Sequence, residues 1–347
     1  MERIYFDANA TVPPLPEAME AVQRGLAETW GNPTSTHREG QKARARLEEA
    51  RRQIAEGLGV APSELVFCAS ATEALYLLIH GLRTALGHRP VAVFPGEHSA
   101  CLNALKGWSE LHWLPELPEA CGVVVQMAAS NETGIRYDMP QVAGALRLQD
   151  AVQAWGKVPL DWRGCDAAVL SGHKIGGPRG AAVLWMRPGL PWEAVMEGPQ
   201  ERRRRGGTED LPAILGLAEA ARRVPERIAR YEAVATLRDA LEAEVLAWSS
   251  DFAVAGRGQE RLPNTSCLIL RGHRGDAVQM ALDLAGFAVS TGSACHSGAT
   301  EPSHALRALG CTESEARSAL RVSLLPDASE AQVAAFLEAL KKVLRRA

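Results

Sequence analysis

The stretch AVLSGHKIGGPRGAAVLW, residues 168–185, places two apolar runs on either side of a short loop that holds one lysine, Lys174. Apolar runs without strict alternation are typical of strands buried on both faces of a sheet. A lysine in such a loop is either an ordinary solvent-exposed side chain or one held in dry surroundings. Dry surroundings lower the pKa of a lysine and free its amine for Schiff-base chemistry. The stretch therefore predicts two strands joined by a loop with a candidate nucleophile.

Similar apolar bursts recur through the first two thirds of the chain. They are ELVFCAS, RPVAVFPG, CGVVVQMAAS and ALRLQDA, and each is bounded by Gly, Pro, Asn, Asp or Ser. Apolar residues at helical spacing predict helices over residues 40–58, where Gly59 is placed as the C-terminal cap, and over ATEALYLLIHGL. Strands followed directly by helices favour an α/β domain around a mostly parallel sheet of the seven-stranded type between helices.

The pattern changes after about residue 206, where long helical periodicities predominate. They are followed by the strand-like runs NTSCLILRG, FAVST and RVSLL, and by helix starts at Thr312, with Glu315 completing a capping box, and at Ser329. This part predicts a smaller α+β domain with which the extreme N-terminus packs. We expect a large domain over residues 16–228 and a small domain formed by residues 1–15 and 229–347.

The composition of the 347 residues is that of an ordinary globular chain, with 46% hydrophobic residues, 23% charged residues and a formal net charge of -3. That balance gives no electrostatic footprint for nucleic acid or an anionic membrane, and the arginine run of residues 202–205 alone is typical of a solvated loop. No apolar run approaches the ~18 residues of a membrane span, and the N-terminus lacks the apolar core of a signal peptide. We expect a cytoplasmic protein without a metal site.

Seven cysteines are scattered along the chain and are never spaced as C-x-x-C, which argues against a disulfide framework or a zinc site and predicts reduced thiols. Cys267 lies in an apolar run and fits a buried small side chain. Cys295 differs, because the stretch VSTGSACHSG, residues 289–298, surrounds it with small residues and no apolar periodicity. We interpret Cys295 as a candidate nucleophile on a loop, and His296 as an exposed loop residue or its activator.

Other candidate residues follow predicted strands. Asp150 ends the run RLQD, at the sheet edge where open α/β sheets bind ligands, although an aspartate taken by itself is more often a helix cap. A small-residue turn leads into a helix at Ala71 and Thr72, which could hold a phosphate or serve as a plain helix start. His98 follows the strand of RPVAVFPG, where its ring could stack on a cofactor.

Taken in order, these segments resemble a known family. The matches are YFDANATVPP, GNPTSTH, SATEA, GEHSA, SNETG, DAVQ, SGHKIGGPRG, QERRRRGGTED, VSTGSACHSG, EPSHALRALG and ALRVSL, and they run almost end to end. The chain resembles the NifS/IscS-type cysteine desulfurases, which are pyridoxal-phosphate enzymes of the class V aminotransferase group with the fold type I architecture. A set of colinear matches is far more specific than any one motif.

The resemblance implies a cofactor site. Lys174 would bind pyridoxal 5'-phosphate covalently, Asp150 would pair with its ring nitrogen, Gln153 would bond its ring hydroxyl, and His98 would stack on the ring. The phosphate would be held by a set of four residues and by a residue of the neighbouring subunit. The four are Ala71, Thr72, Ser171 and His173, and the residue from the neighbour is Thr208. A site completed in this way implies a homodimer.

The resemblance also implies the reaction. Asn131 would lie near the ring and the substrate, Arg321 would bind the carboxylate of L-cysteine, and the Cys295 thiolate would take the sulfur as a persulfide while alanine is released. His98 is the family's candidate proton handler. The sulfur would pass to a protein acceptor for iron-sulfur cluster, thio-cofactor or tRNA biosynthesis, and Cys295 is also a candidate transient iron-sulfur ligand.

Two departures and two alternatives accompany this interpretation. The chain is short between His98 and Asp150, which puts the docking partner in doubt, and Gly176 stands where relatives often carry an aromatic residue. A sibling activity is one alternative: a selenocysteine lyase, another C-S lyase or an aminotransferase. A catalytically weakened scaffold in a sulfur-transfer assembly is the other. The retained Lys174, Asp150 and Cys295 argue against the scaffold.

Overall fold

The computed structural model describes residues 3–87, 89–291 and 302–345. Contacts within the chain divide it into two compact units. The larger unit comprises residues 13–128 and 137–225, and the smaller unit comprises residues 1–12, 129–136 and 226–347. The short segment 129–136 thus belongs to the smaller unit, whereas the sequence placed it within a continuous 16–228 domain.

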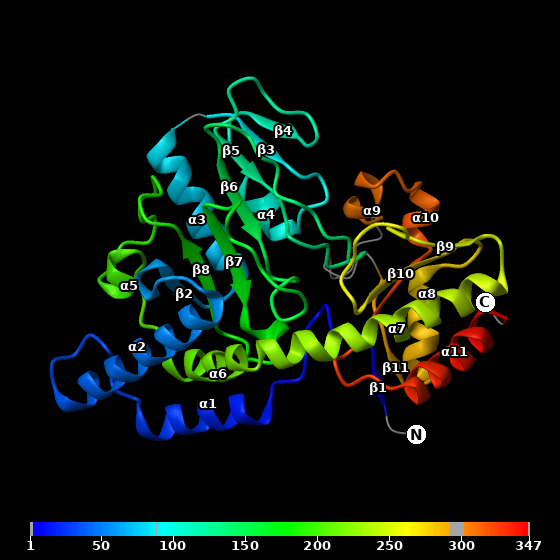
Figure 1. Cartoon of the computed structure of the whole chain (residues 1–347), viewed down its shortest axis with the longest axis horizontal. Helices are drawn as coiled ribbons and strands as arrows, with labels where there is room; N and C mark the ends of the chain where they lie inside the picture. Colours follow the sequence, from blue (N-terminus) through cyan, green and yellow to red (C-terminus); the bar gives the residue numbers. More distant parts are fainter. Residues whose placement is uncertain (1–2, 88, 292–301, 346–347) are drawn as a thin grey trace. The chain divides into compact units, whose positions relative to one another are not determined.

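A seven-stranded sheet forms the centre of the larger unit, in the order β2-β8-β7-β6-β5-β3-β4 (Figure 1). Neighbouring strands are parallel except at β8, which runs antiparallel to both β2 and β7. The strands are β2 (Leu65–Cys68), β3 (Val91–Val93), β4 (Leu111–Trp113), β5 (Val123–Val125), β6 (Leu146–Asp150), β7 (Ala167–Ser171) and β8 (Ala182–Met186). The predicted α/β class with a mostly parallel sheet is confirmed.

Two apolar layers cover this sheet. One contains buried residues of α1 (Pro16–Glu28), α2 (Arg38–Leu58) and α6 (Leu211–Arg222), and the other contains those of α3 (Ala71–Leu86) and α4 (Ser99–Ala104). All residues of β7 and β8 are buried, which explains why their sequences lack alternation. The sheet is therefore a rigid platform whose strand ends can carry functional groups. Two short elements complete the unit, the 3-10 turn η1 (Pro62–Glu64) and α5 (Gln200–Arg203).

The smaller unit contains two small sheets. β1 (Ile4–Tyr5) pairs in parallel with β11 (Phe287–Ala288), and β10 (Thr265–Leu270) lies between β9 (Phe252–Val254) and β12 (Ala319–Ser323) in antiparallel register. Its helices are α7 (Val224–Trp248, from Glu226 onward), α8 (Gly275–Leu284), α9 (His304–Ala308), α10 (Glu313–Arg317) and α11 (Glu330–Leu344). The N-terminal strand is thus built into the unit that contains the C-terminal helices.

Local signals in the sequence predicted several helix ends correctly. Gly59 caps α2 with a φ of 67°, a conformation that glycine adopts without steric cost. Thr312 and Ser329 each complete a capping box, at α10 and α11. The predicted regular alternation of strand and helix is wrong between β5 and β7, where turns connect the strands. These connections carry few apolar residues at helical spacing, so nothing there favours a helix.

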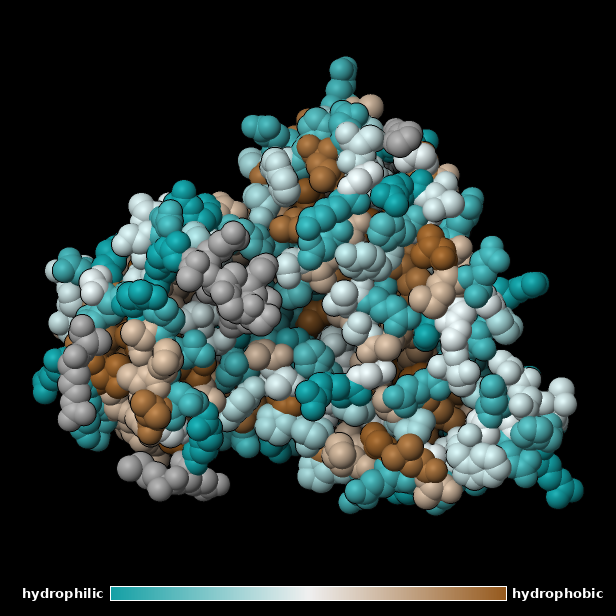
Figure 2. Space-filling model, turned by 180° about the vertical axis from the view of Figure 1, so that it is seen from behind, coloured by the Kyte–Doolittle hydropathy of each residue, from teal (hydrophilic) through white to brown (hydrophobic). Residues whose placement is uncertain are grey.

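The surface is mixed in polarity. On the face drawn in Figure 2, hydrophobic residues occur in separate patches among hydrophilic ones. Among the described residues, no helix is both long and apolar enough to cross a membrane.

Candidate active site

Lys174 ends a single 3-10 turn, η2 (Gly172–Lys174), that directly follows β7. The turn is closed by hydrogen bonds to the Gly172 carbonyl from the amides of Ile175 and Gly177, at 3.0 and 2.9 Å. Gly172 must be glycine, because a Cβ there would lie 2.9 Å from the Ala181 carbonyl oxygen. The turn therefore holds the half-buried Lys174 in a fixed backbone at the carboxyl end of a central strand.

Asp150 is the last residue of β6, the strand beside β7, and is 8% exposed. Its Oδ1 accepts a hydrogen bond from the Val152 amide at 3.0 Å. Burial raises the pKa of Asp150, while the neighbouring His98, the Val152 hydrogen bond and the charge of Lys174 lower it. Because His98 and Lys174 both act on the carboxyl group, the three predicted residues lie together at one edge of the sheet.

His98 lies between β3 and α4 and caps that helix. Its Nδ1 accepts a hydrogen bond from the Ala100 amide at 3.1 Å. An Nδ1 that accepts must be unprotonated, so the neutral ring carries its proton on Nε2. The cap therefore sets both the orientation of the ring and the atom that can donate or exchange a proton.

Gln153 is buried and receives a hydrogen bond that the sequence analysis missed. The ammonium of Lys157, which is 1% exposed, donates to Gln153 Oε1 at 2.7 Å. An ammonium has no acceptor, so the amide oxygen of Gln153 faces Lys157 and its NH₂ group is left to donate elsewhere. The only signal in the sequence was a lysine four residues after the glutamine.

Glu97 was also missed, although it precedes His98 in the chain. The side chain is fully buried, and its carboxylate accepts from the Met127 amide. Burial and the neighbouring Asp150 raise the pKa of Glu97 well above its usual range. Ionisation of Asp150 therefore disfavours ionisation of Glu97 beside it. No pattern in the sequence distinguishes this glutamate from a surface residue.

The residues predicted to hold a phosphate lie at two places in the larger unit. Ala71 and Thr72 open α3, where Ser70 caps the helix and the first backbone N–H groups have no partner within it. Ser171 is buried at the end of β7, and the next residues of η2 include His173. Burial and the charge of Lys174 lower the pKa of His173 to about 4, so its ring is neutral at pH 7.

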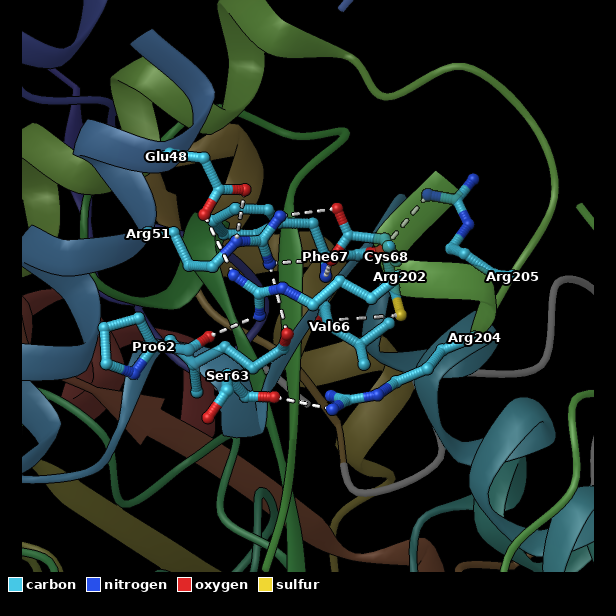
Figure 3. Close-up of polar contacts among 12 residues, drawn as sticks. Glu48, Arg51, Pro62, Ser63, Val66, Phe67, Cys68, Arg202, Arg204 and Arg205 are labelled. Atoms are coloured by element: carbon cyan, nitrogen blue, oxygen red, sulfur yellow. Dashed lines mark hydrogen bonds and ion pairs between the residues drawn. The ribbon is translucent and has the colours of Figure 1, made fainter. Parts of the chain in front are cut away.

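The arginine run of residues 202–205 is only partly the solvated loop that its composition predicted, because Arg202 and Arg203 are exposed but three of its four arginines have fixed partners. Arg202 donates to Glu48 and to the Pro62 carbonyl, at 2.9 and 3.1 Å, and Arg204 donates to the Ser63 carbonyl at 2.6 Å (Figure 3). Arg205 is 9% exposed and donates to the Phe67 carbonyl. The run fastens its loop to the start of the sheet, three residues before the exposed Thr208.

The same loop contains a buried ion pair. Arg51 donates through both terminal nitrogens to the two carboxylate oxygens of Glu201, each at 2.8 Å, and Glu201 also accepts from the Phe67 amide. Three consecutive residues there, Glu201, Arg202 and Arg203, have φ values of 48°, 59° and 66°. Left-handed backbone at non-glycine residues costs about 1 kcal/mol or more per residue, so the ion pairs hold a strained loop in place.

Arg321 and Asn131 belong to the smaller unit. Arg321 lies on β12, is 3% exposed, and donates from Nη2 to Asp7 Oδ1 at 2.7 Å and from Nη1 to the Asn131 carbonyl at 3.1 Å. Its buried Nε has no hydrogen-bond partner among the described residues. Asn131 is held in turn by Asn9 Nδ2, which donates to the same carbonyl at 3.1 Å. Cys295 and His296 lie outside the described residues.

The residues of the larger unit fit pyridoxal phosphate. The cofactor needs an amine to bind it, a carboxylate for its ring nitrogen and donors for its phosphate. The electrostatic grouping of Lys174, Asp150 and His98 supplies the first two beside an oriented aromatic ring. Gly176, which stands where relatives often carry an aromatic residue, has a φ of 89°, and a Cβ there would lie 2.8 Å from the Leu15 side chain. That departure therefore has a local packing reason.

Comparison with known proteins agrees with this geometry. Residues 4–336 match the model of the aminotransferase class-V family. A cysteine desulfurase of Cereibacter sphaeroides is 38% identical over 99% of this chain and 96% of its own length. A solved NifS-like protein superposes with a TM-score of 0.91 at 29% identity, covering 99% of this chain and 100% of that one. SspA, solved in complex with cysteine, gives 0.78 at 27% identity, over 93% of this chain and 99% of that one.

These matches define first the class and then the family. The chain belongs to the aminotransferase class-V family, whose members generally use pyridoxal phosphate. Within the class it belongs to the cysteine desulfurases of the NifS/IscS type. The resemblance inferred from the motifs is confirmed.

Proposed function

We propose that this chain is a pyridoxal-phosphate-dependent cysteine desulfurase that converts L-cysteine to L-alanine and receives the sulfur on Cys295. The observation that carries the proposal is the grouping of Lys174, His98 and Asp150 at one edge of the sheet, since it unites an amine, an oriented imidazole and a buried carboxylate. The cysteine desulfurase relatives and the cysteine complex of SspA support the choice of substrate.

Each residue of the larger unit has a task in this proposal. Bound pyridoxal phosphate supplies an electron sink for the electrons released at the substrate Cα. Lys174 binds the cofactor and, once released from it, takes the Cα proton on Nζ. Asp150 pairs with the ring nitrogen in this proposal and would hold the proton there. Gln153, oriented by Lys157, donates to the ring hydroxyl through its amide NH₂ group.

Sulfur transfer requires the thiolate of Cys295. The thiolate attacks the sulfur of the bound cysteine, an S–S bond forms, and the Cβ–S bond breaks with its electron pair left on the carbon fragment. Proton return to that fragment gives alanine, and no external oxidant is needed for this step. His98 Nε2 is placed to handle a proton, because Nδ1 is occupied by the Ala100 amide. Arg321 binds the substrate carboxylate in this proposal, and Asn131 lies beside it.

The proposal extends to partners and compartment. A homodimer would let Thr208 of each subunit complete the phosphate site of the other, and the exposure of Thr208 on a tightly fastened loop is consistent with that role. A protein acceptor, an iron-sulfur scaffold or a sulfur carrier, would take the persulfide sulfur in the cytoplasm. Analytical ultracentrifugation of the purified chain tests the dimer.

The central experiment measures cofactor and product together. The purified chain should show the visible absorbance band of bound pyridoxal phosphate and, with L-cysteine and a reductant, release alanine and sulfide in equal amounts. Cys295→Ala should keep the band and lose sulfide, whereas the matched variant Cys311→Ala, which removes a half-buried thiol of the same unit, should keep both.

Three outcomes would contradict the proposal in different ways. Absence of the band would remove the cofactor assignment. Sulfide release undiminished in Cys295→Ala would remove the role of that thiol. Turnover of L-selenocysteine but not of L-cysteine, measured in parallel, would instead favour the selenocysteine lyase activity that the sequence left open.

A further inference from the structure

The segment that carries Cys295 joins two buried serines of the smaller unit, Ser290 and Ser303, which are 3% and 4% exposed. Ser290 pairs with Arg321 through two backbone hydrogen bonds. The Arg321 amide donates to the Ser290 carbonyl at 2.7 Å, and the Ser290 amide donates to the Arg321 carbonyl at 3.2 Å. Ser290, which precedes the Cys295 segment, is therefore fixed to the backbone of Arg321.

The return end is fixed by a side chain. Ser303 Oγ donates to Glu132 Oε2 at 2.5 Å and accepts from the Leu306 amide at 3.1 Å, which caps α9. Glu132 is 5% exposed, so water does not readily replace either partner. Loss of one partner of a buried hydrogen bond leaves the other unsatisfied, which costs more than the bond itself contributes.

Glu132 leads back to the arginine. It follows Asn131, whose carbonyl accepts from Arg321 Nη1 at 3.1 Å. The turn that contains Asn131 and Glu132 is held by Ser130 Oγ, which accepts hydrogen bonds from the amides of Glu132 and Thr133, both at 3.2 Å. Both ends of the Cys295 segment are thus attached to Arg321, one through its backbone and the other through Ser303, Glu132 and Asn131.

Charge strengthens the attachment at the return end. Burial raises the pKa of Glu132 to about 7, while the Ser303 hydrogen bond and the charge of Arg321 lower it. Glu132 also acts on Cys267 of β10, whose pKa is raised mainly by its own burial. Above pH 7 the ionised carboxylate accepts from Ser303, and hydrogen bonds to an ionised acceptor are about twice as strong as neutral ones.

We propose that Glu132 is a positioning residue for sulfur transfer, which through Ser303 holds the return end of the Cys295 segment on the same buried scaffold as Arg321. The inference rests on the proposed desulfurase function. Cys295 lies five residues after Ser290 and eight before Ser303 in the sequence. The reach of its thiol toward a substrate held by Arg321 therefore depends on both attachment points, and a misplacement of about 1 Å costs of the order of 10²-fold in rate.

Steady-state kinetics of the holoenzyme test this role. Ser303→Ala and Glu132→Ala should lower kcat for sulfide release about 10- to 100-fold, with KM for L-cysteine changed far less. Ser303→Thr and Glu132→Gln keep a hydroxyl donor and an oxygen acceptor, so they should restore most of kcat. Thr312→Ala is the matched control, because it removes the N-cap of the neighbouring helix α10 without touching Glu132. It should lower the melting temperature and leave kcat unchanged.

A second readout does not depend on turnover. Labelling of Cys295 by iodoacetamide, measured by mass spectrometry against Cys311, should change at least ~3-fold in Ser303→Ala and Glu132→Ala and stay at the wild-type ratio in Thr312→Ala. Unchanged kcat and labelling in the two alanine variants, beside an active wild type, would overturn the positioning role. A wild type that labels normally but releases no sulfide would instead contradict the proposed function and leave the attachment to be judged by labelling alone.

Discussion

In the larger unit, Lys174, Asp150 and His98 each lie within a few residues of a strand end, whereas in the smaller unit Arg321 reaches its partners across the chain. Its ion pair with Asp7 spans 314 residues of sequence, and its hydrogen bond to Asn131 spans 190. The first group is oriented by its own turns and caps, and the second by long-range contacts. The two groups should therefore respond differently to substitution.

The largest effect is expected at the lysine turn. Lys174→Ala should abolish the cofactor absorbance band and lower alanine formation by more than about 10³-fold, because no other group can both bind the cofactor and move the Cα proton. The fold should survive, since the backbone of the turn is held by glycine and amide hydrogen bonds. Absorbance and circular dichroism check both statements. Lys106→Ala, an exposed lysine of the same unit, is the control, and retained turnover in Lys174→Ala would refute the assignment.

The next effect concerns stability in the larger unit. Glu201→Ala should lower the free energy of unfolding by about 3 to 5 kcal/mol, because it leaves the buried guanidinium of Arg51 only its longer contact with the partly exposed Glu48. Urea denaturation measures the change. The double variant Arg51→Met with Glu201→Leu should recover much of the loss, since it leaves no buried charge. A loss below 1 kcal/mol in Glu201→Ala would mean that the pair does not hold the strained loop.

The smaller unit should depend on pH through Glu132. Its folded pKa of about 7 is above the ordinary 4.5, so the folded state binds this proton more tightly than the unfolded state does. The wild type should therefore lose stability as pH rises from about 4.5 through 7, by about 3 to 4 kcal/mol at most. Glu132→Gln should not show this loss of stability. Thermal unfolding at pH 5 and pH 8 gives the measurement, and parallel pH profiles of the two proteins would exclude the effect.

The smallest effect is expected from a conservative change at the arginine. Arg321→Lys should raise KM for L-cysteine about tenfold. An ammonium lacks the planar fork of a guanidinium, so it cannot donate to Asp7, to the Asn131 carbonyl and to the substrate carboxylate at the same time. The absorbance band should be unchanged, since the residues predicted to bind the cofactor lie in the other unit, Asn131 excepted. Titration with L-cysteine gives KM. An altered absorbance band with an unchanged KM would mean that Arg321 acts on the cofactor and not on the substrate, and would contradict the prediction.

The same contrast explains what the sequence could predict. Apart from β4, which no apolar run predicted, the strands of the larger sheet follow from local patterns of apolar and turn residues, as do the α2 cap at Gly59 and the loop around Lys174. Lys157, Glu97 and Glu132 could not be found in this way, because each stands out only through its burial and through the partners that the fold brings to it. The arginine run misled for the same reason, since its partners are carbonyls and carboxylates from residues 48–73.

The pairing of the N-terminal strand β1 with β11 has a practical consequence for anyone who shortens this chain. Asp7 and Asn9 follow that strand directly, and they hold Arg321 and Asn131. Trimming the first ten residues would remove a counter-ion from a buried guanidinium and an amide from the Asn131 turn. Such a truncated protein would be expected to keep its cofactor colour while handling cysteine poorly. An inactive preparation should therefore be checked for proteolysis at its N-terminus before its chemistry is questioned.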